Sequence, residues 1–118
     1  MLVNSSARST FEDSRAHGVS LGSGVVMLFD ETADFADLVR RVAAFFRDES
    51  CGQCVPCRVG TVRQEELLSR HITSGQPLDT ALLHEIDKVM RDASICGLGH
   101  TAAIAIRSAI DIGLVEAT

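Results

Sequence analysis

Four cysteines constrain the fold and the chemistry of this 118-residue chain more than any other feature of its sequence. Three of them stand at successive C-x2-C spacings and the fourth follows after 38 intervening residues, so the pattern is C-x2-C-x2-C-x38-C; they are Cys51, Cys54, Cys57 and Cys96. Three thiolates on so tight a turn can reach one side of a compact cofactor, and the distant fourth can close the other side. Four cysteine ligands are the usual set for a [4Fe-4S] cluster, which the spacing therefore predicts.

The residues beside these cysteines fit the same prediction. Glycines at Gly52, Gly97 and Gly99 would let the backbone bend close to inorganic sulfides, where amide N–H groups can donate hydrogen bonds. Arg58 directly follows the third cysteine, at the start of a predicted helix. Its charge and the positive end of the helix would favour the reduced, more negative state of a cluster. These four residues are predicted to surround the ligands.

Three other uses of four thiols compete with a cluster. Structural zinc usually takes two C-x2-C pairs from separate knuckles, and the three-plus-one spacing fits that arrangement poorly. A pair of disulfides would need an oxidising compartment and strained links between cysteines only two residues apart. A thioredoxin-type thiol needs one C-x-x-C pair on a βαβ scaffold, which the sequence does not indicate. Zinc remains the main alternative.

Charge and hydropathy exclude several functional classes. The formal net charge is −5, and the eleven Lys and Arg residues are scattered rather than gathered into a basic patch, which argues against nucleic-acid binding. No apolar run is long enough for a transmembrane helix, and the first 18 residues lack the apolar core of a secretory signal. We therefore expect a chain of the reducing cytoplasm, where cysteines bind metals or carry out redox chemistry.

Hydrophobic periodicity predicts an all-α fold, a small four-helix bundle with short connections. The expected helices cover residues of about 32–50, 57–73, 79–93 and 101–115. Thr32 or Asp34 can cap the first helix, Pro56 is tolerated in the first turn of the second, and Gly75 ends that helix. The last helix is apolar nearly all round at its start, which is typical of a central or a docking helix.

Each of the two middle helices has a predicted apolar stripe. In the second helix the stripe consists of Val59, Val62, Leu67, Leu68 and Ile72. In the third helix it consists of Leu82, Leu83, Ile86, Val89, Met90 and Ala93. Both stripes are expected to face the core.

The chain divides into three predicted parts. Residues 1–18 are polar and aperiodic, and we expect a mobile N-terminal tail there. Residues 19–32 form a Gly-rich lead-in that contains the apolar run 25–29, predicted to be a buried short strand or an extended segment. Residues 33–118 form the four-helix cluster domain.

The cysteine motifs also carry a family resemblance. "ESCGQCVPCRVGT" (residues 49–61) together with "SICGLGHTAA" (residues 94–103) resembles the C-terminal [4Fe-4S] domain in the family of NADH-binding flavoprotein subunits. That family includes the flavin subunit of respiratory complex I, the beta subunit of NAD-dependent formate dehydrogenase and the diaphorase subunit of NAD-reducing hydrogenase. "LGSGVVMLFDE" (residues 21–31) is similar to the stretch that leads into this domain. The residues of these motifs look closer to the formate dehydrogenase and hydrogenase branch than to complex I itself.

The resemblance implies a function and a set of partners. One [4Fe-4S] cluster would be bound by Cys51, Cys54, Cys57 and Cys96 and would exchange single electrons with a flavin that reacts with NADH. Further electron transfer would run to other iron–sulfur centres. The implied partners are a flavin/NADH-binding subunit and other iron–sulfur subunits of an oxidoreductase complex. FMN and NAD would be bound only on that partner or on a missing domain, because neither the flavin domain nor the ubiquitin-like domain of the family fits in front of Leu21. We therefore expect a split or truncated gene product or an isolated C-terminal domain.

The sequence thus predicts a one-electron relay that is not catalytic alone. His100, directly after the last motif, is interpreted as a surface residue or a neighbour of the site rather than a ligand. The alternative function is a structural or docking domain in which a metal stabilises the fold without a redox role.

Overall fold

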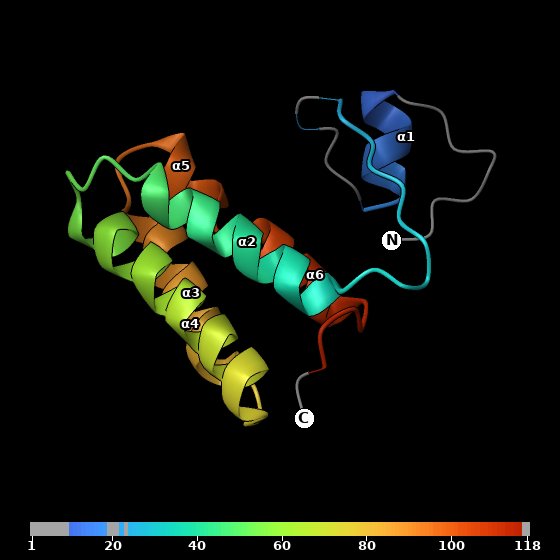
Figure 1. Ribbon diagram of the computed structural model, residues 1–118. Coiled ribbons are helices and arrows are strands. Elements are labelled where there is room, and N and C mark those ends of the chain that lie inside the picture. Colours follow the sequence, from blue (N-terminus) through green and yellow to red (C-terminus); the bar gives the residue numbers. More distant parts are fainter. Residues whose placement is uncertain (1–9, 19–21, 23, 117–118) are drawn as a thin grey trace. The chain divides into compact units, whose positions relative to one another are not determined.

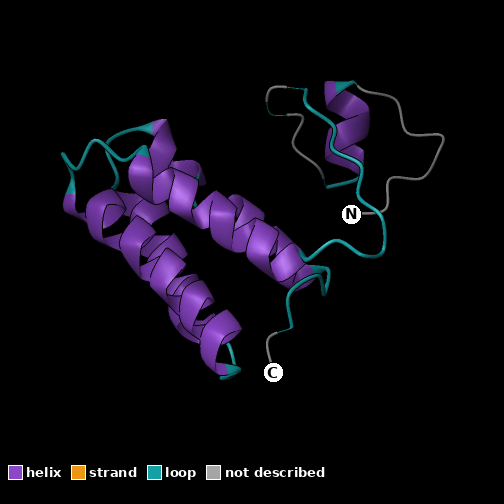
Figure 2. Ribbon diagram, in the orientation of Figure 1, coloured by secondary structure: helices purple, strands orange, loops and turns teal. Residues whose placement is uncertain are grey.

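The computed structural model describes residues 10–18, 22 and 24–116 of the chain. Within them the regular structure is entirely helical, as Figure 2 shows, which confirms the all-α prediction. In chain order the helices are α1 (Phe11–Ala16), α2 (Phe35–Asp48), α3 (Val55–Ser74), α4 (Thr80–Ala93), α5 (Gly97–Thr101) and α6 (Ile104–Asp111). Two compact units make up the chain, residues 1–33 and residues 34–118, and each is described by itself.

The first unit contains a helix that the sequence reasoning missed. The hydroxyl of Thr10 caps α1 by accepting a hydrogen bond from the backbone N–H of Asp13 at 3.2 Å. Glu12 and Asp13 add negative charge to the first turn, where it is favourable. The predicted tail therefore includes a short helix at residues 11–16, and its residues 1–9 lie outside the described part of the chain.

The apolar run at residues 25–29 forms no strand in the described structure. The expectation of burial is also wrong for it, since all five side chains are exposed and Leu28 is 93% exposed. A strand is stable only when it pairs with others, and no second strand exists among the described residues. The lead-in is consequently an irregular segment there.

Helices α2 to α6 form the small helical bundle of the second unit (Figure 1). Helix α3 packs against both α2 and α4, and α6 packs against α2. The main core cluster consists of Val39, Ala43, Leu67, Leu68, Leu78, Leu83, Ile106, Ala109 and Val115. No helix in the described ranges is both long enough and apolar enough to cross a lipid bilayer.

The boundaries of α2 and α3 follow the predicted local signals. Asp34 caps α2, because its side chain accepts a hydrogen bond from the backbone N–H of Asp37 at 3.0 Å. Pro56 lies in the first turn of α3, where its missing N–H costs nothing. Gly75 ends α3 with a left-handed φ of 63°.

The predicted fourth helix, residues 101–115, is shorter in the structure, where α6 covers Ile104–Asp111, and an additional short helix that was not predicted, α5, precedes it at Gly97–Thr101. No Gly or Pro marks the break between them, which falls at Ala102 and Ala103. Both alanines are buried in a second apolar cluster with Met90 of α4. The break is therefore set by tertiary packing rather than by a local sequence signal.

The middle helices bury only part of the predicted apolar stripes: Leu67, Leu68, Leu83 and Met90 are buried as predicted, whereas Val59, Ile72, Leu82 and Val89 are exposed. Helix α3 buries Gly60, Thr61, Gln64, Leu67 and Leu68, while Val59 is 46% exposed. On α4 the buried side chains are Leu83, Asp87 and Met90. The exposed parts of the two apolar stripes form an open groove between α3 and α4, with Val55, Val59, Leu82, Ile86 and Val89 among its lining residues.

Candidate functional site

All four cysteines line one pocket of about 270 Å³. The loop between α2 and α3 and the first turn of α3 supply three of the thiols, and the turn before α5 supplies the fourth, at the same end of the bundle in Figure 1. The lining residues are Glu49, Ser50, Cys51, Gln53, Cys54, Cys57, Ile95, Cys96 and Leu98. A pocket of this size can hold a group several times larger than a water molecule, which occupies about 30 Å³ in the liquid.

Helix boundaries position the thiols on the pocket. Cys54 immediately precedes the first turn of α3, Cys57 lies within that turn, and Cys96 immediately precedes α5. Cys57 is 5% exposed and so forms the buried side of the site, whereas Cys51 and Cys96 are exposed. The first turn of α3 carries backbone N–H groups without helical partners and the positive end of the helix dipole, both of which favour negative charge.

The two cysteine loops touch at Cys54. Its thiol pKa is lowered chiefly by the backbone N–H of Ile95 from the second loop, and next by the backbone N–H of Cys57. The Ser94 hydroxyl also lowers this pKa, although its oxygen lies outside full hydrogen-bonding geometry with any described residue. A lowered pKa favours the thiolate, which is the form of cysteine that ligates metals.

The first loop is held by Gly52 and Arg58. Gly52 has a φ of 73°, a left-handed conformation that side chains other than glycine rarely adopt. The Arg58 guanidinium donates from Nη1 to the Gly52 carbonyl oxygen at 3.2 Å and so fastens the loop to α3. Arg58 thus has a structural contact beyond the charge that singled it out in the sequence.

The second loop depends on Gly99. A Cβ atom on this residue would lie 2.2 Å from the Ser94 hydroxyl oxygen and 3.2 Å from the Cys57 Cβ. The glycine is therefore required by close packing of α5 against protein atoms. A Cβ on Gly97 would meet nothing within 4 Å. His100 is exposed, and its Nε2 lies 2.8 Å from the Ser94 carbonyl oxygen, to which it donates.

Sequence reasoning missed two hydroxyl groups beside Cys57. The Ser50 hydroxyl oxygen lies 3.4 Å from the Cys57 sulfur, and the Thr61 hydroxyl donates to the Cys57 carbonyl oxygen at 2.9 Å. Thr61 follows Cys57 by four residues on a helix, so helical spacing could have indicated it. Ser50 is near Cys57 only because the loop folds back, which no sequence spacing indicates.

The residues fit a [4Fe-4S] cluster better than a single ion. In the part of the chain that the structure describes, no three His, Cys, Asp or Glu side chains converge enough to hold one metal ion. Tetrahedral zinc needs its thiolates about 2.3 Å from a single point. A cubane spreads four thiolates over four irons, so its ligands line a larger space. Four thiols around one roomy pocket match that requirement.

A small helical domain with four thiols on one roomy pocket fits the class of iron–sulfur binding domains. Comparison with protein families agrees, because residues 37–112 match the family described as the NADH-ubiquinone oxidoreductase-F iron-sulfur binding region. The chain therefore belongs to this family, whose cofactor is a [4Fe-4S] cluster. The resemblance carried by the cysteine motifs is confirmed.

Similar proteins are oxidoreductase subunits. The chain is 33% identical over 101 residues to NADH dehydrogenase [ubiquinone] flavoprotein 1, mitochondrial, of Dictyostelium discoideum, a match that covers 85% of this chain and 21% of that protein. It is 33% identical over 91 residues to the NADH-ubiquinone oxidoreductase 51 kDa subunit, mitochondrial, of Neurospora crassa, with 76% and 18% covered. It is 36% identical over 93 residues to NADP-reducing hydrogenase subunit HndC of Solidesulfovibrio fructosivorans, with 77% and 19% covered. The chain thus spans about a fifth of the length of these relatives.

Proposed function

We propose that this chain is a one-electron relay module that binds a [4Fe-4S] cluster through Cys51, Cys54, Cys57 and Cys96. The observation that carries the proposal is the shared pocket, because residues 39 positions apart along the chain meet there with no other cysteine left over. When bound, such a cluster takes up and releases one electron at a time.

The residues around that pocket have different proposed roles. Cys57 would hold the cofactor from the buried side, and the exposed Cys51 and Cys96 would leave it accessible to another redox protein. Arg58 and the first turn of α3 place positive charge beside the ligands, which favours the more negative, reduced state. Gly52, Gly97 and Gly99 would let the backbone come close to a bound cofactor, so that N–H groups could donate to its sulfurs.

The electron donors and acceptors are proposed to lie outside this chain. A flavin/NADH-binding subunit or domain would carry FMN and NAD, and other iron–sulfur subunits would complete an NAD-linked oxidoreductase complex. Support comes from relatives named as a flavoprotein and as subunits of NADH-ubiquinone oxidoreductase and NADP-reducing hydrogenase. One of these names favours a hydrogenase-type complex. A formate dehydrogenase complex is supported only by the residues of the cysteine motifs. The cytoplasm is the proposed compartment, since it keeps such thiols reduced.

A second candidate is a docking domain that a metal stabilises without redox activity. The observation that favours it is the open apolar groove between α3 and α4, where Val55, Val59 and Val89 are exposed. Exposed apolar surface of this kind is typical of a protein contact.

A redox titration separates the two candidates. The chain is reconstituted anaerobically with iron and sulfide and titrated with dithionite, and electron paramagnetic resonance spectra are recorded at each potential. A relay gives a signal that appears on reduction by one electron and disappears on reoxidation. A metal centre with no reversible signal over the whole range would favour the docking domain instead.

A further inference from the structure

We propose that the hydroxyl of Ser50 donates a hydrogen bond to the sulfur of Cys57 and thereby raises the reduction potential of the bound cluster. This inference rests on the proposed role of Cys57 as a ligand. Ser50 lies in the loop between α2 and α3, and its oxygen is 3.4 Å from the Cys57 sulfur in a half-buried position. Hydrogen bonds that involve sulfur are normally longer than those between oxygen and nitrogen.

The direction of this hydrogen bond follows from a third group. The Ser50 oxygen also lies 3.4 Å from the backbone nitrogen of Gly52, and a backbone N–H can only donate. The oxygen therefore accepts from Gly52 and keeps its own hydrogen for the sulfur. A thiolate ligand has no hydrogen to give, so it must accept. Both neighbours thus orient the hydroxyl toward Cys57.

Burial makes Cys57 the ligand at which a protein donor matters most. Its side chain is 5% exposed, so water has little access to its sulfur. Cys51 and Cys96 are exposed, and water can donate to their sulfurs whatever the protein provides. A hydrogen bond is also stronger in surroundings of low dielectric constant than in water. Ser50 consequently supplies the buried ligand with a donor that solvent cannot replace.

The effect on the potential has a definite sign. Reduction adds one electron to the cofactor and makes its sulfurs more negative, so a donor stabilises the reduced state more than the oxidised state. Hydrogen bonds to the sulfurs are among the factors that set cluster potentials. Removal of the Ser50 hydroxyl should lower the potential, which makes the ratio of reduced to oxidised chains about twofold to tenfold smaller at a fixed potential.

The test compares Ser50→Ala with the wild-type chain in the same anaerobic titration with dithionite. Ser74→Ala is the matched control, because that hydroxyl donates to the Arg70 carbonyl at the far end of α3. Equal iron and sulfide contents with a lower potential for Ser50→Ala alone support the inference. An unchanged potential in a fully loaded Ser50→Ala chain overturns it, and it leaves the proposed cluster intact. A wild-type chain that binds no cluster contradicts the proposed function instead.

A second pair of variants applies if the alanine variant loses iron. Ser50→Thr keeps the hydroxyl and Ser50→Val has nearly the same shape without it. The threonine variant should keep the wild-type potential and the valine variant should show the twofold to tenfold fall. Equal potentials for the two would overturn the inference, because shape alone would then account for the effect.

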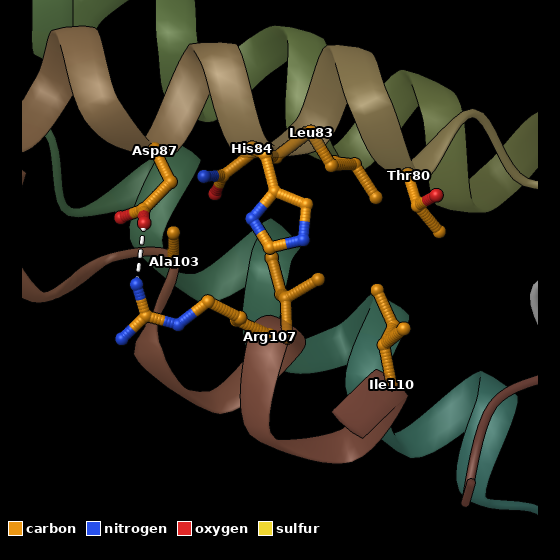
Figure 3. Close-up of a pocket in the computed structure, with 9 residues that line it drawn as sticks. Thr80, Leu83, His84, Asp87, Ala103, Arg107 and Ile110 are labelled. Carbon is orange, nitrogen blue, oxygen red and sulfur yellow. Dashed lines mark hydrogen bonds and ion pairs between the residues drawn. The ribbon is translucent and has the colours of Figure 1, made fainter. Parts of the chain in front are cut away.

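A different observation carries a second inference, which is independent of the cluster. A small cavity of about 20 Å³, lined by both polar and apolar side chains, lies between α3, α4 and α6 (Figure 3). Gln64 lines it and is 1% exposed, yet neither its amide nitrogen nor its amide oxygen has a hydrogen-bond partner among the described residues. We infer that one ordered water molecule binds in this cavity and satisfies the Gln64 amide.

The volume of the cavity and the polar groups that line it both indicate water as the bound molecule. One water needs about 10–15 Å³ of such space and two to four polar partners, and a larger ligand would not fit. Figure 3 shows Asp87, His84 and Arg107 around the cavity, and Thr80 also lines it. The Gln64 amide offers a donor and an acceptor, and water can pair with both.

A crystal structure of the reconstituted chain, at a resolution that shows ordered solvent, tests this second inference. A water within hydrogen-bonding distance of the Gln64 amide is the expected result. A dry cavity, or an amide turned to bond other protein atoms, would overturn it.

Discussion

The guanidinium of Arg107 on α6 donates a hydrogen bond of 2.7 Å to the carboxylate of Asp87 on α4. Asp87 is buried, and its second partner is Arg91, at 3.4 Å on its own helix. A buried carboxylate must be paired, because desolvation of an unpaired charge is costly. This pair therefore links the last helix of the bundle to α4.

Loss of this link should destabilise the fold. Arg107→Met leaves the buried Asp87 carboxylate with Arg91 alone, and we expect the free energy of unfolding to fall by about 1–3 kcal/mol. The measurement is denaturant unfolding of the reconstituted chain. Lys88→Met is the control, because it breaks an exposed pair with Asp92 and should change stability much less. Equal effects of the two variants would show that the α4–α6 link stabilises the fold no more than an exposed ion pair does.

Two glycines of the second cysteine loop should respond differently to alanine. Gly99→Ala places a methyl group 2.2 Å from the Ser94 oxygen, and Ser94 is itself buried. Such overpacking typically costs about 1–3 kcal/mol, measured here as a lower thermal unfolding midpoint. Gly97→Ala is the matched control, since its methyl group meets nothing within 4 Å. Ser94→Gly in the Gly99→Ala chain should restore part of the loss, and no recovery at all would show that the contact with Ser94 is not its cause.

The charge of Arg58 should raise the reduction potential. Arg58→Glu places a negative charge beside the ligands, and we expect a lower potential in the anaerobic titration, with a smaller shift at high salt. Arg58 also holds the Gly52 carbonyl, so Arg58→Lys separates charge from loop geometry and should stay close to wild type. Arg70→Glu makes the same charge change on exposed surface farther along α3. An unchanged potential in Arg58→Glu would show that the charge of Arg58 has no influence on the reduction potential.

Each cysteine should be needed for the cofactor. We expect Cys51→Ser, Cys54→Ser, Cys57→Ser and Cys96→Ser each to lose the cluster or to convert it to a form with less iron. Iron and sulfide analysis of each variant after identical reconstitution is the measurement, with Ser74→Ala as a surface control. Full iron and sulfide in any one cysteine variant would show that its thiol is not a ligand.

Local signals in the sequence predicted several elements correctly. The cysteine spacing predicted that the distant Cys96 would lie beside the three thiols of the first motif, and all four cysteines line one pocket. Asp34 and Gly75 predicted the start of α2 and the end of α3, because caps act through residues only a few positions away. The short α1 was missed although Thr10 and Asp13 carry the same kind of signal.

Features that depend on packing between helices could not be predicted in this way. Helix α3 buries Gln64 together with the predicted core residues Leu67 and Leu68, whereas Val59 of the predicted stripe is exposed. Periodicity identifies faces of a helix but not which one meets a partner. The break between α5 and α6 has the same origin, since buried Ala102 and Ala103 show no local breaker.

Iron, sulfide and zinc analysis of the anaerobically reconstituted wild-type chain tests the central claim most directly. We predict about four irons and four sulfides per chain and no bound zinc, which is the composition of one [4Fe-4S] cluster held by four cysteine ligands. One zinc per chain without sulfide, obtained under strict exclusion of oxygen, would contradict the cluster. The four cysteines would then form a structural metal site, and the proposed electron-relay function would be wrong.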